Sequence, residues 1–304
     1  MLQQMELLNG RVARNGEAFG NVHVYVNPSE TERKYLSETL KLDEHTLASA
    51  LDPDELARLE FEPDHVAIIF KRPRNYSNED QFVFKVSSIG LFLFSDKLVI
   101  VLPEDFSLVQ GKPFARVSSL HDLALRLIYS SIFHFVEHLK VVNAVSDSLE
   151  QQINTSMQNK YLLDLFSLEK SLVYYLNAIN SNGKLIERLK NSAAKIGFSA
   201  DNVEFIDDLI IENGQCYEQA EIYSNILASM MDARVSIVSN NLNWLMKTLN
   251  IITIAIMLPT LVVSIFSMNV EFPGKAHPWA FWIILALASV SVVAVRLVWR
   301  WKKW

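Results

Sequence analysis

The sequence predicts an α/β domain followed by long helices, the last two of which cross a membrane. The stretch from Thr248 to Val270 has 23 residues and no charged side chain. At ~1.5 Å per helical residue it reaches ~34 Å, enough to cross a hydrocarbon core of ~30 Å. A second uncharged stretch runs from Trp279 to Val295. The first ~105 residues instead alternate short apolar runs with polar turns, which is typical of an α/β domain.

The charge of the chain is unevenly distributed. Residues 243–304 hold six Lys/Arg and one Asp/Glu, which leaves 22 of the 28 basic and 33 of the 34 acidic residues, a net charge of −11, for residues 1–242. The large negative charge of residues 1–242 disfavours nucleic acid as a partner and attracts cations. Cys216 is the only cysteine, so no intrachain disulfide can form, which suits a reducing compartment. No signal peptide is expected at the N-terminus.

Residues 1–118 are expected to form the α/β domain. Strands are predicted at 22–26, 66–70, 81–86, 89–94 and 97–102, and short helices at 29–40, 43–51 and 54–59. Gly90 stands alone inside a strand run and predicts a bulge rather than a phosphate-binding loop. Because no nucleotide-binding glycine motif occurs, no organic cofactor is expected.

Residues 119–198 predict an antiparallel helical hairpin. The first helix is expected from Ser119 to about Asn154, with an apolar stripe along it, and the second from about Lys160 to Leu189. Gly197 breaks the chain, and Ser199 can cap the next helix.

Residues 199–268 predict a stalk helix that continues into the first membrane span. Its apolar residues recur at three and four positions, averaging near 3.5, which favours packing against copies of itself or neighbouring helices. The result is one helix of ~70 residues, roughly 100 Å long, soluble at its start and membrane-spanning at its end.

The first membrane span carries one polar line. On a helix of ~100° per residue, with Met246 at zero, one set of residues falls within ~60° of that line. The set is Asn243, Asn250, Thr253, Met257, Thr260, Ser264 and Ser267. Thr248, at the membrane edge, is the one polar side chain off the line. The line is either a helix–helix contact or the wall of a pore.

The second membrane helix is expected over 279–299, after an external loop at 269–278. Tryptophans lie near both ends of this helix, as interfacial aromatic residues do. A basic tail follows at 300–304, and the positive-inside rule places such an end in the cytoplasm. Two spans then return the N-terminal part to the same side. We therefore expect a multi-pass protein of the plasma (inner) membrane with both termini cytoplasmic.

The end of the first span resembles a known motif. Phe266, Ser267, Met268 and Asn269 stand where the CorA family of magnesium channels carries Tyr-Gly-Met-Asn, followed by a short loop, a second span and a basic tail. The likeness is gapless over 27 positions. Ser267 replaces the motif glycine, and Pro259 stands one place later than the usual proline.

The resemblance implies a CorA-like homopentameric funnel that moves Mg²⁺, or Co²⁺ or Ni²⁺, down its electrochemical gradient. Its partners would be copies of itself, the lipid bilayer and divalent cations, and it would not be an enzyme. The implied selectivity filter is Ser267, Met268 and Asn269. The implied pore-lining residues are Asn243, Met246, Leu249, Asn250, Thr253, Met257, Thr260 and Ser264, with Met246, Leu249 and Met257 forming an apolar constriction.

The resemblance also implies regulation by cytoplasmic Mg²⁺. Asp208 aligns with a stalk acid that helps bind Mg²⁺ between subunits in related channels, and Asp207 and Glu212 lie near it in sequence. Glu79 and Asp80 of a neighbouring α/β domain are candidate partners. On composition alone, these stalk acids are instead a solvated helix face.

Two alternatives remain open at this stage. The first is a Zn²⁺ transporter of the same architecture, because Ser267 adds a side chain at the filter. The second is a membrane-tethered metal-dependent enzyme, because His134, Glu137 and His138 have the H-x-x-E-H spacing of a zinc peptidase family. A catalytic zinc needs a third protein ligand, which the sequence does not offer, so a surface or interhelical histidine pair is the preferred interpretation.

Overall fold

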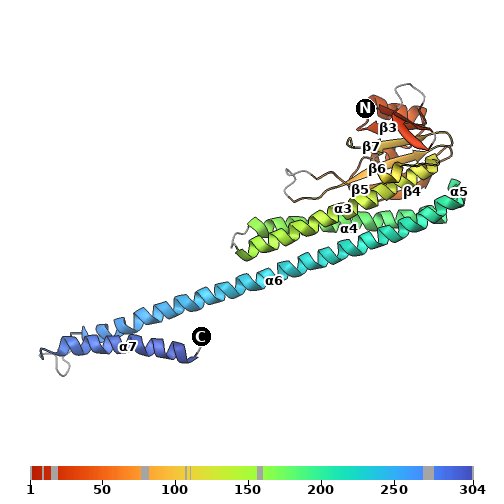
Figure 1. Cartoon of the computed structure of the whole chain (residues 1–304). Helices are drawn as coiled ribbons and strands as arrows, with labels where there is room; N and C mark the ends of the chain where they lie inside the picture. Colours follow the sequence, from red (N-terminus) through yellow and green to blue (C-terminus); the bar gives the residue numbers. More distant parts are fainter. Residues whose placement is uncertain are drawn as a thin grey trace. The chain divides into compact units, whose positions relative to one another are not determined.

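The computed structural model describes residues 2–8, 10–14, 20–76, 82–106, 108–109, 111–155, 160–269 and 277–302 (Figure 1). The chain divides into two compact units, residues 1–231 and residues 232–304. The first unit contains the sheet and most helices. The second contains the two apolar helices.

The first unit is built on a sheet of seven strands among the described residues. The strands are β1 (Leu2–Leu8), β2 (Arg11–Arg14), β3 (Val22–Val26), β4 (Arg58–Phe61), β5 (Val66–Pro73), β6 (Val86–Leu93) and β7 (Leu98–Leu102). Their order is β2-β1-β3-β7-β6-β5-β4, with β3 and β7 parallel and the other pairs antiparallel. Strands β5, β6 and β7 are mostly apolar and almost entirely buried, because helices cover both faces of the sheet; Lys71 and Arg72 of β5 are buried charged exceptions.

Short helices cover one face of the sheet. They are α1 (Glu30–Lys34), the π-helical segment η1 (Tyr35–Thr39) and α2 (Glu44–Ser49). Ser29 and Glu32 form a capping box at the start of α1, and the Asp43 carboxylate accepts from the backbone of Thr46 at the start of α2. Leu36 and Leu47 pack with the outward side chains of the sheet in a small second core.

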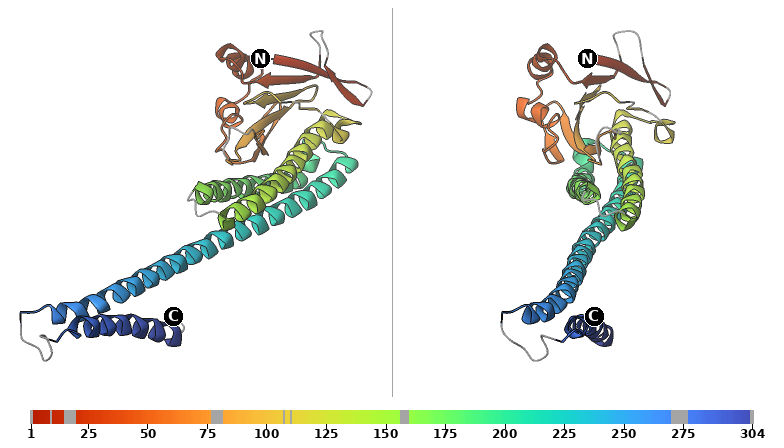
Figure 2. Two further views of the ribbon diagram at one scale, coloured as in Figure 1. Left: turned by 60° about the vertical axis from the view of Figure 1, so that its left-hand side comes forward. Right: turned by 90° about the vertical axis from the view of Figure 1, so that its left-hand side faces the viewer.

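Long helices cover the other face. They are α3 (Leu120–Thr155), α4 (Lys160–Asn191) and the first part of α6 (Ala200–Phe266), with the short helices η3 (Lys112–Phe114) and α5 (Ala193–Ile196) between them. Figure 2 shows α3 and α4 as a hairpin below the sheet, with the start of α6 alongside. Ile206, Leu209 and Leu227 of α6 are buried in the main core. The periodic apolar residues in the first part of α6 therefore pack against helices of the same chain.

The predicted fold class is confirmed, with local corrections in the N-terminal region. Residues expected as a helix at 54–59 instead form a turn and β4, where Leu59 pairs with Ile68. The strand expected at 81–86 is wrong over residues 82–85, because Phe84 lies in a loop and stacks on Tyr76 with 4.5 Å between ring centroids; Val86 is the first residue of β6. Strands β1 and β2 were not predicted.

Gly90 does not form the expected bulge. It pairs in regular register with Ile69 and Val101 in the middle of β6. A Cβ atom at this position would lie 2.5 Å from the Cβ of Ala50, just after α2. Glycine is required here because the helix layer approaches the sheet too closely for a side chain.

The second unit consists of the rest of α6 and helix α7 (Ala280–Lys302). Each helix contains an 18-residue stretch of high mean hydropathy, 2.3 in α6 and 2.4 in α7. Within the chain, 0% of the α6 stretch and 11% of the α7 stretch are buried. Such long, apolar and uncovered helices are suited to lipid rather than to the core of a soluble domain.

Candidate functional site

The polar line predicted on the first membrane span lies on the uncovered side of α6. All of its residues from Asn243 to Ser267 are exposed within the chain. The half-buried residues of the same segment are different ones: Ile251, Ala255, Pro259, Val262 and Phe266. On the same helical wheel they fall at ~140° to ~220°, opposite the polar line.

Helix α7 accounts for the covered side. An apolar groove between the two helices is lined on α6 by Ile251, Ile254 and Leu258, and on α7 by Ala294, Val295, Val298 and Trp299. Thr248, the one polar residue off the line, is also half-buried on that side. The contact between the two spans of one chain therefore leaves the polar line free.

The hydroxyl groups of the polar line are oriented by the helix itself. Thr253 donates to the carbonyl oxygen of Leu249 at 2.8 Å, and Thr260 donates to that of Ile256 at 2.7 Å. Because each hydroxyl hydrogen is used within the helix, the oxygen lone pairs remain available. The line thus presents neutral acceptor oxygens, which can bind water or a hydrated cation.

The motif residues Ser267, Met268 and Asn269 follow the end of α6 and are exposed. The Ser267 backbone N–H donates to the Val263 carbonyl at 3.1 Å, and its hydroxyl donates to the Ser264 carbonyl at 2.9 Å. The φ angle of Ser267 is not positive. A serine is therefore accommodated here without strain, and it satisfies carbonyl groups at the helix end.

Three apolar residues interrupt the polar line. Met246, Leu249 and Met257 are 61%, 61% and 63% exposed within the chain. They lie on the same uncovered side as the hydroxyl and amide groups, away from α7. An apolar ring within a polar path is the arrangement that dewetting gates use.

Comparison with known proteins identifies the family. The family model described as CorA-like Mg²⁺ transporter protein matches residues 22–301. The chain belongs to this family. A CorA-like chain is a transport protein, so the alternative of a membrane-tethered enzyme is dropped. The cobalt/magnesium transport protein CorA of Methanocaldococcus jannaschii is 24% identical over 289 residues, which cover 91% of this chain and 89% of that protein.

Two solved full-length structures share the fold. The complete structure of the CorA magnesium transporter from M. jannaschii matches with a TM-score of 0.79 at 20% identity, covering 98% of this chain and 96% of that one. The full-length CmaX protein matches with a TM-score of 0.75 at 13% identity, covering 100% and 98%. Because the identities are low, these matches establish the fold of this chain and no more.

The predicted stalk acids are split between two faces of α6. Asp207 pairs with Lys190 of α4, with 2.6 Å between Oδ1 and Nζ. Asp208 and Glu212 are exposed and stand four residues apart, on one face of the helix. Glu79 and Asp80 lie outside the described residues. Within the described ranges, no three His, Cys, Asp or Glu side chains gather to hold a metal ion.

The histidine pair on α3 is used in a polar network. The His134 and His138 ring centroids are 4.4 Å apart. Nδ1 of His134 accepts from the Arg72 guanidinium at 3.2 Å, and Nδ1 of His138 lies 2.7 Å from the Tyr175 hydroxyl. His138 thus links α3 to α4 through Tyr175, and the nearby guanidinium of Arg72 disfavours a metal cation at the pair. Arg72 was missed from the sequence because it is 62 residues from His134.

Proposed function

We propose that the protein is a homopentameric channel that moves Mg²⁺ into the cell down its electrochemical gradient, with Co²⁺ and Ni²⁺ as further permeant ions. The observation that carries this proposal is the position of the polar line, opposite the side of α6 that faces α7. In a ring of copies, the first spans would form the pore wall and α7 would surround them. The name of the M. jannaschii relative, a cobalt/magnesium transport protein, supports this choice of ions.

The chemistry of the line suits Mg²⁺. This ion prefers oxygen ligands and gives up its water reluctantly, so a site for a largely hydrated ion needs neutral oxygens. A ring of Asn269 amides and nearby backbone carbonyls at the outer mouth would supply them, and Thr260 and Ser264 would continue the path. Neutral groups hold the ion loosely enough for it to leave. A divalent ion crossing 100 mV gains about 4.6 kcal/mol, so inward flow needs no ATP.

Self-association has a surface available on the stalk part of α6. Ile211, Ile222 and Ile226 are 57%, 56% and 44% exposed within the chain. Exposed apolar side chains on a soluble helix mark an interaction surface when they gather on one side. The basic C-terminal tail supports a cytoplasmic location for both termini.

Asp208 is proposed to bind regulatory Mg²⁺ between subunits. With cytoplasmic Mg²⁺ bound, the stalks would be held together and the ring of Met246, Leu249 and Met257 would stay dry. When the ion leaves, carboxylates repel one another and the stalks separate. We expect Asp208→Ala to abolish inhibition of flux by internal Mg²⁺, measured in proteoliposomes loaded with increasing Mg²⁺. Glu221→Ala, which removes an exposed acid farther along α6 that belongs to no candidate site, is the matched control. An unchanged response in Asp208→Ala would exclude this site.

A Zn²⁺ transporter of the same architecture is the second candidate. It is favoured by one observation, the Ser267 hydroxyl at the implied filter, where the motif has no side chain. A side chain there narrows the mouth and changes the ligands near Asn269.

The test is ion entry into proteoliposomes that carry a fluorescent indicator, with Mg²⁺, Zn²⁺ and Ni²⁺ run in parallel. We expect Mg²⁺ entry in the wild type and its loss in Asn269→Ala, because the filter loses its amide ring. Asn241→Ala removes an exposed amide that lies off the polar line and should keep full flux. Entry of Zn²⁺ without Mg²⁺ would select the second candidate. No entry of any ion, from verified oligomers in low internal Mg²⁺, would contradict both.

A further inference from the structure

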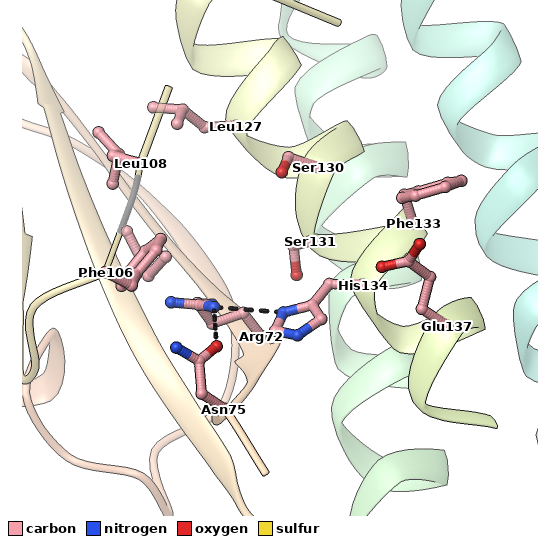
Figure 3. A pocket seen from close by; sticks show the side chains of 11 residues that line it. Arg72, Asn75, Phe106, Leu108, Leu127, Ser130, Ser131, Phe133, His134 and Glu137 are labelled. Carbon is pink, nitrogen blue, oxygen red and sulfur yellow. Dashed lines mark hydrogen bonds between the residues drawn. The ribbon is translucent and has the colours of Figure 1, made fainter. Parts of the chain in front are cut away.

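A second site lies in the soluble unit, far in sequence from the membrane spans. A cavity of about 480 Å³ opens between the sheet and α3 (Figure 3). Its lining comes from β5, β6, the segment after β7, and α3. None of its residues belongs to the polar line or to the stalk acids.

Arg72 is the charged group at the buried end of this cavity. Its side chain is only 5% exposed, and its guanidinium stacks on Phe106, with Cζ 3.3 Å from the ring centroid. Nη2 donates to Asn75 at 3.3 Å and to His134 at 3.2 Å. Nη1 is buried and has no hydrogen-bond partner among the described residues. A buried cationic donor without a partner is costly, which indicates that a ligand completes it.

The groups around Arg72 balance its charge only in part. Burial lowers the pKa of Arg72 to about 10, so it is charged at neutral pH. Burial, with His138 and Arg72 nearby, lowers the pKa of His134 to about 3, so this neighbour is a neutral imidazole. The Glu104 carboxylate acts on the charge of Arg72; its Oε2 is bound by Arg74 at 2.7 Å, and its Oε1 has no hydrogen-bond partner among the described residues. The two positive charges of Arg72 and Arg74 therefore exceed the one negative charge of Glu104.

The rest of the cavity combines apolar walls with polar groups. Ile89, Phe106, Leu108, Leu127 and Phe133 supply apolar walls. Ser130 lies on the α3 side of the opening, and the exposed Glu137 carboxylate stands away from Arg72 at the outer end (Figure 3). The volume exceeds what a bare inorganic anion fills, and most small-ligand sites combine apolar walls with a few fixed polar groups.

We propose that this cavity binds a small organic anion, with a carboxylate or phosphate group on Arg72 and Asn75 and an apolar body between Phe106 and Leu127. The anionic oxygens accept from the Arg72 guanidinium, which turns its otherwise unused Nη1 toward them on binding. The charge of Arg72 excludes the transported divalent cation from this site. The proposal is independent of the channel function, and its test contains no flux measurement.

The test is isothermal titration calorimetry on the full-length protein in detergent, with benzoate and phenyl phosphate as probes. We expect both to bind saturably, and benzyl alcohol, which has the ring without the charge, not to bind. Inorganic phosphate should bind at least tenfold more weakly than phenyl phosphate, because it lacks the apolar body.

Two variants place the binding in this cavity. Arg72→Met keeps the apolar stem and removes the charge, and should weaken binding of both probes at least tenfold. Ser130→Phe keeps the charge and fills the opening, and should have the same effect, so it decides the question if Arg72→Met does not fold. Arg116→Met removes an exposed arginine outside the cavity and should bind like the wild type. No saturable binding, or binding unchanged in a folded Arg72→Met or Ser130→Phe protein, would overturn the proposal.

Discussion

Single side chains explain two features that the sequence alone left unresolved. Ser267 fits at the end of α6 because its backbone is not left-handed there and its hydroxyl bonds the Ser264 carbonyl. His134 and His138 were recognisable from their spacing of four residues, but their partners were not. Arg72 and Tyr175 come from β5 and α4, and no local pattern indicates that they meet the pair.

The buried histidines predict a stability that depends on pH. Burial, assisted by the nearby Arg72, lowers the pKa of His138 to about 4. The unfolded chain protonates His138 near pH 6.5, whereas the folded chain does so only near pH 4. The stability that His138 contributes is therefore fully present above pH 6.5 and is lost as the pH falls toward 4. For His138 the loss of unfolding free energy between pH 7 and pH 5 is about 2 kcal/mol.

Thermal denaturation of the full-length protein at pH 7 and pH 5 measures this effect. The drop in Tm should be smaller in His138→Gln than in the wild type, because one buried titrating group is gone. His277→Gln, which removes an exposed histidine of the second unit, is the matched control. An equal drop in the wild type and His138→Gln would show that His138 is not held neutral by burial.

At the scale of elements, periodic helices could be predicted and irregular edges could not. α3 and α4 begin and end within two residues of the expected bounds, because long apolar stripes fix them. β4 was mistaken for a helix, and β1 and β2 were missed, because short half-exposed strands depend on their pairing partners. The α7-facing side of α6 was also unpredictable, since its residues are as apolar as those that face lipid.

The side-chain amide of Asn182 connects the helix layer to the edge of β5. β4 pairs with β5 only as far as Ile69, so the backbone of Lys71 has no strand partner on that edge, although Lys71 pairs with Ser88 of β6 on the other edge. The Asn182 side chain of α4 takes the place of that strand partner, accepting from the Lys71 N–H at 2.8 Å and donating to the Lys71 carbonyl at 2.7 Å. Asn182 is fully buried, so this pair of bonds is shielded from water.

Asn182→Leu should destabilise the protein by about 1–3 kcal/mol, because it leaves the buried N–H of Lys71 without this partner, whereas the Lys71 carbonyl still accepts from the Ser131 hydroxyl at 2.6 Å. A lower Tm of the full-length protein, followed by circular dichroism, is the readout. Asn180→Leu makes the same change at an exposed position of α4 and should leave Tm nearly unchanged. Equal effects of the two substitutions would refute the role of Asn182 in this connection.

At the scale of the whole molecule, the membrane helices are apolar surfaces that the single chain leaves uncovered. The soluble unit has its own core of sheet and long helices, whereas the membrane part of α6 is covered on one side only. The polar line could be predicted from a period of ~100° per residue. Only the structure shows that α7 packs against the opposite side of α6 and leaves the line uncovered. The central claim is that copies of this free side meet around a water-filled path.

The most direct measurement is modification of single cysteines by a positively charged, water-soluble thiol reagent during Mg²⁺ entry into proteoliposomes. The native Cys216 is buried, and burial raises its pKa to about 12, so it should not react. Thr260→Cys and Ser264→Cys place a thiol on the polar line, and Ala255→Cys and Val262→Cys place one on the opposite side. We predict that the reagent blocks entry in the first pair and spares the second. Block in the second pair with the first pair unaffected would contradict the claim that this side of α6 lines the pore.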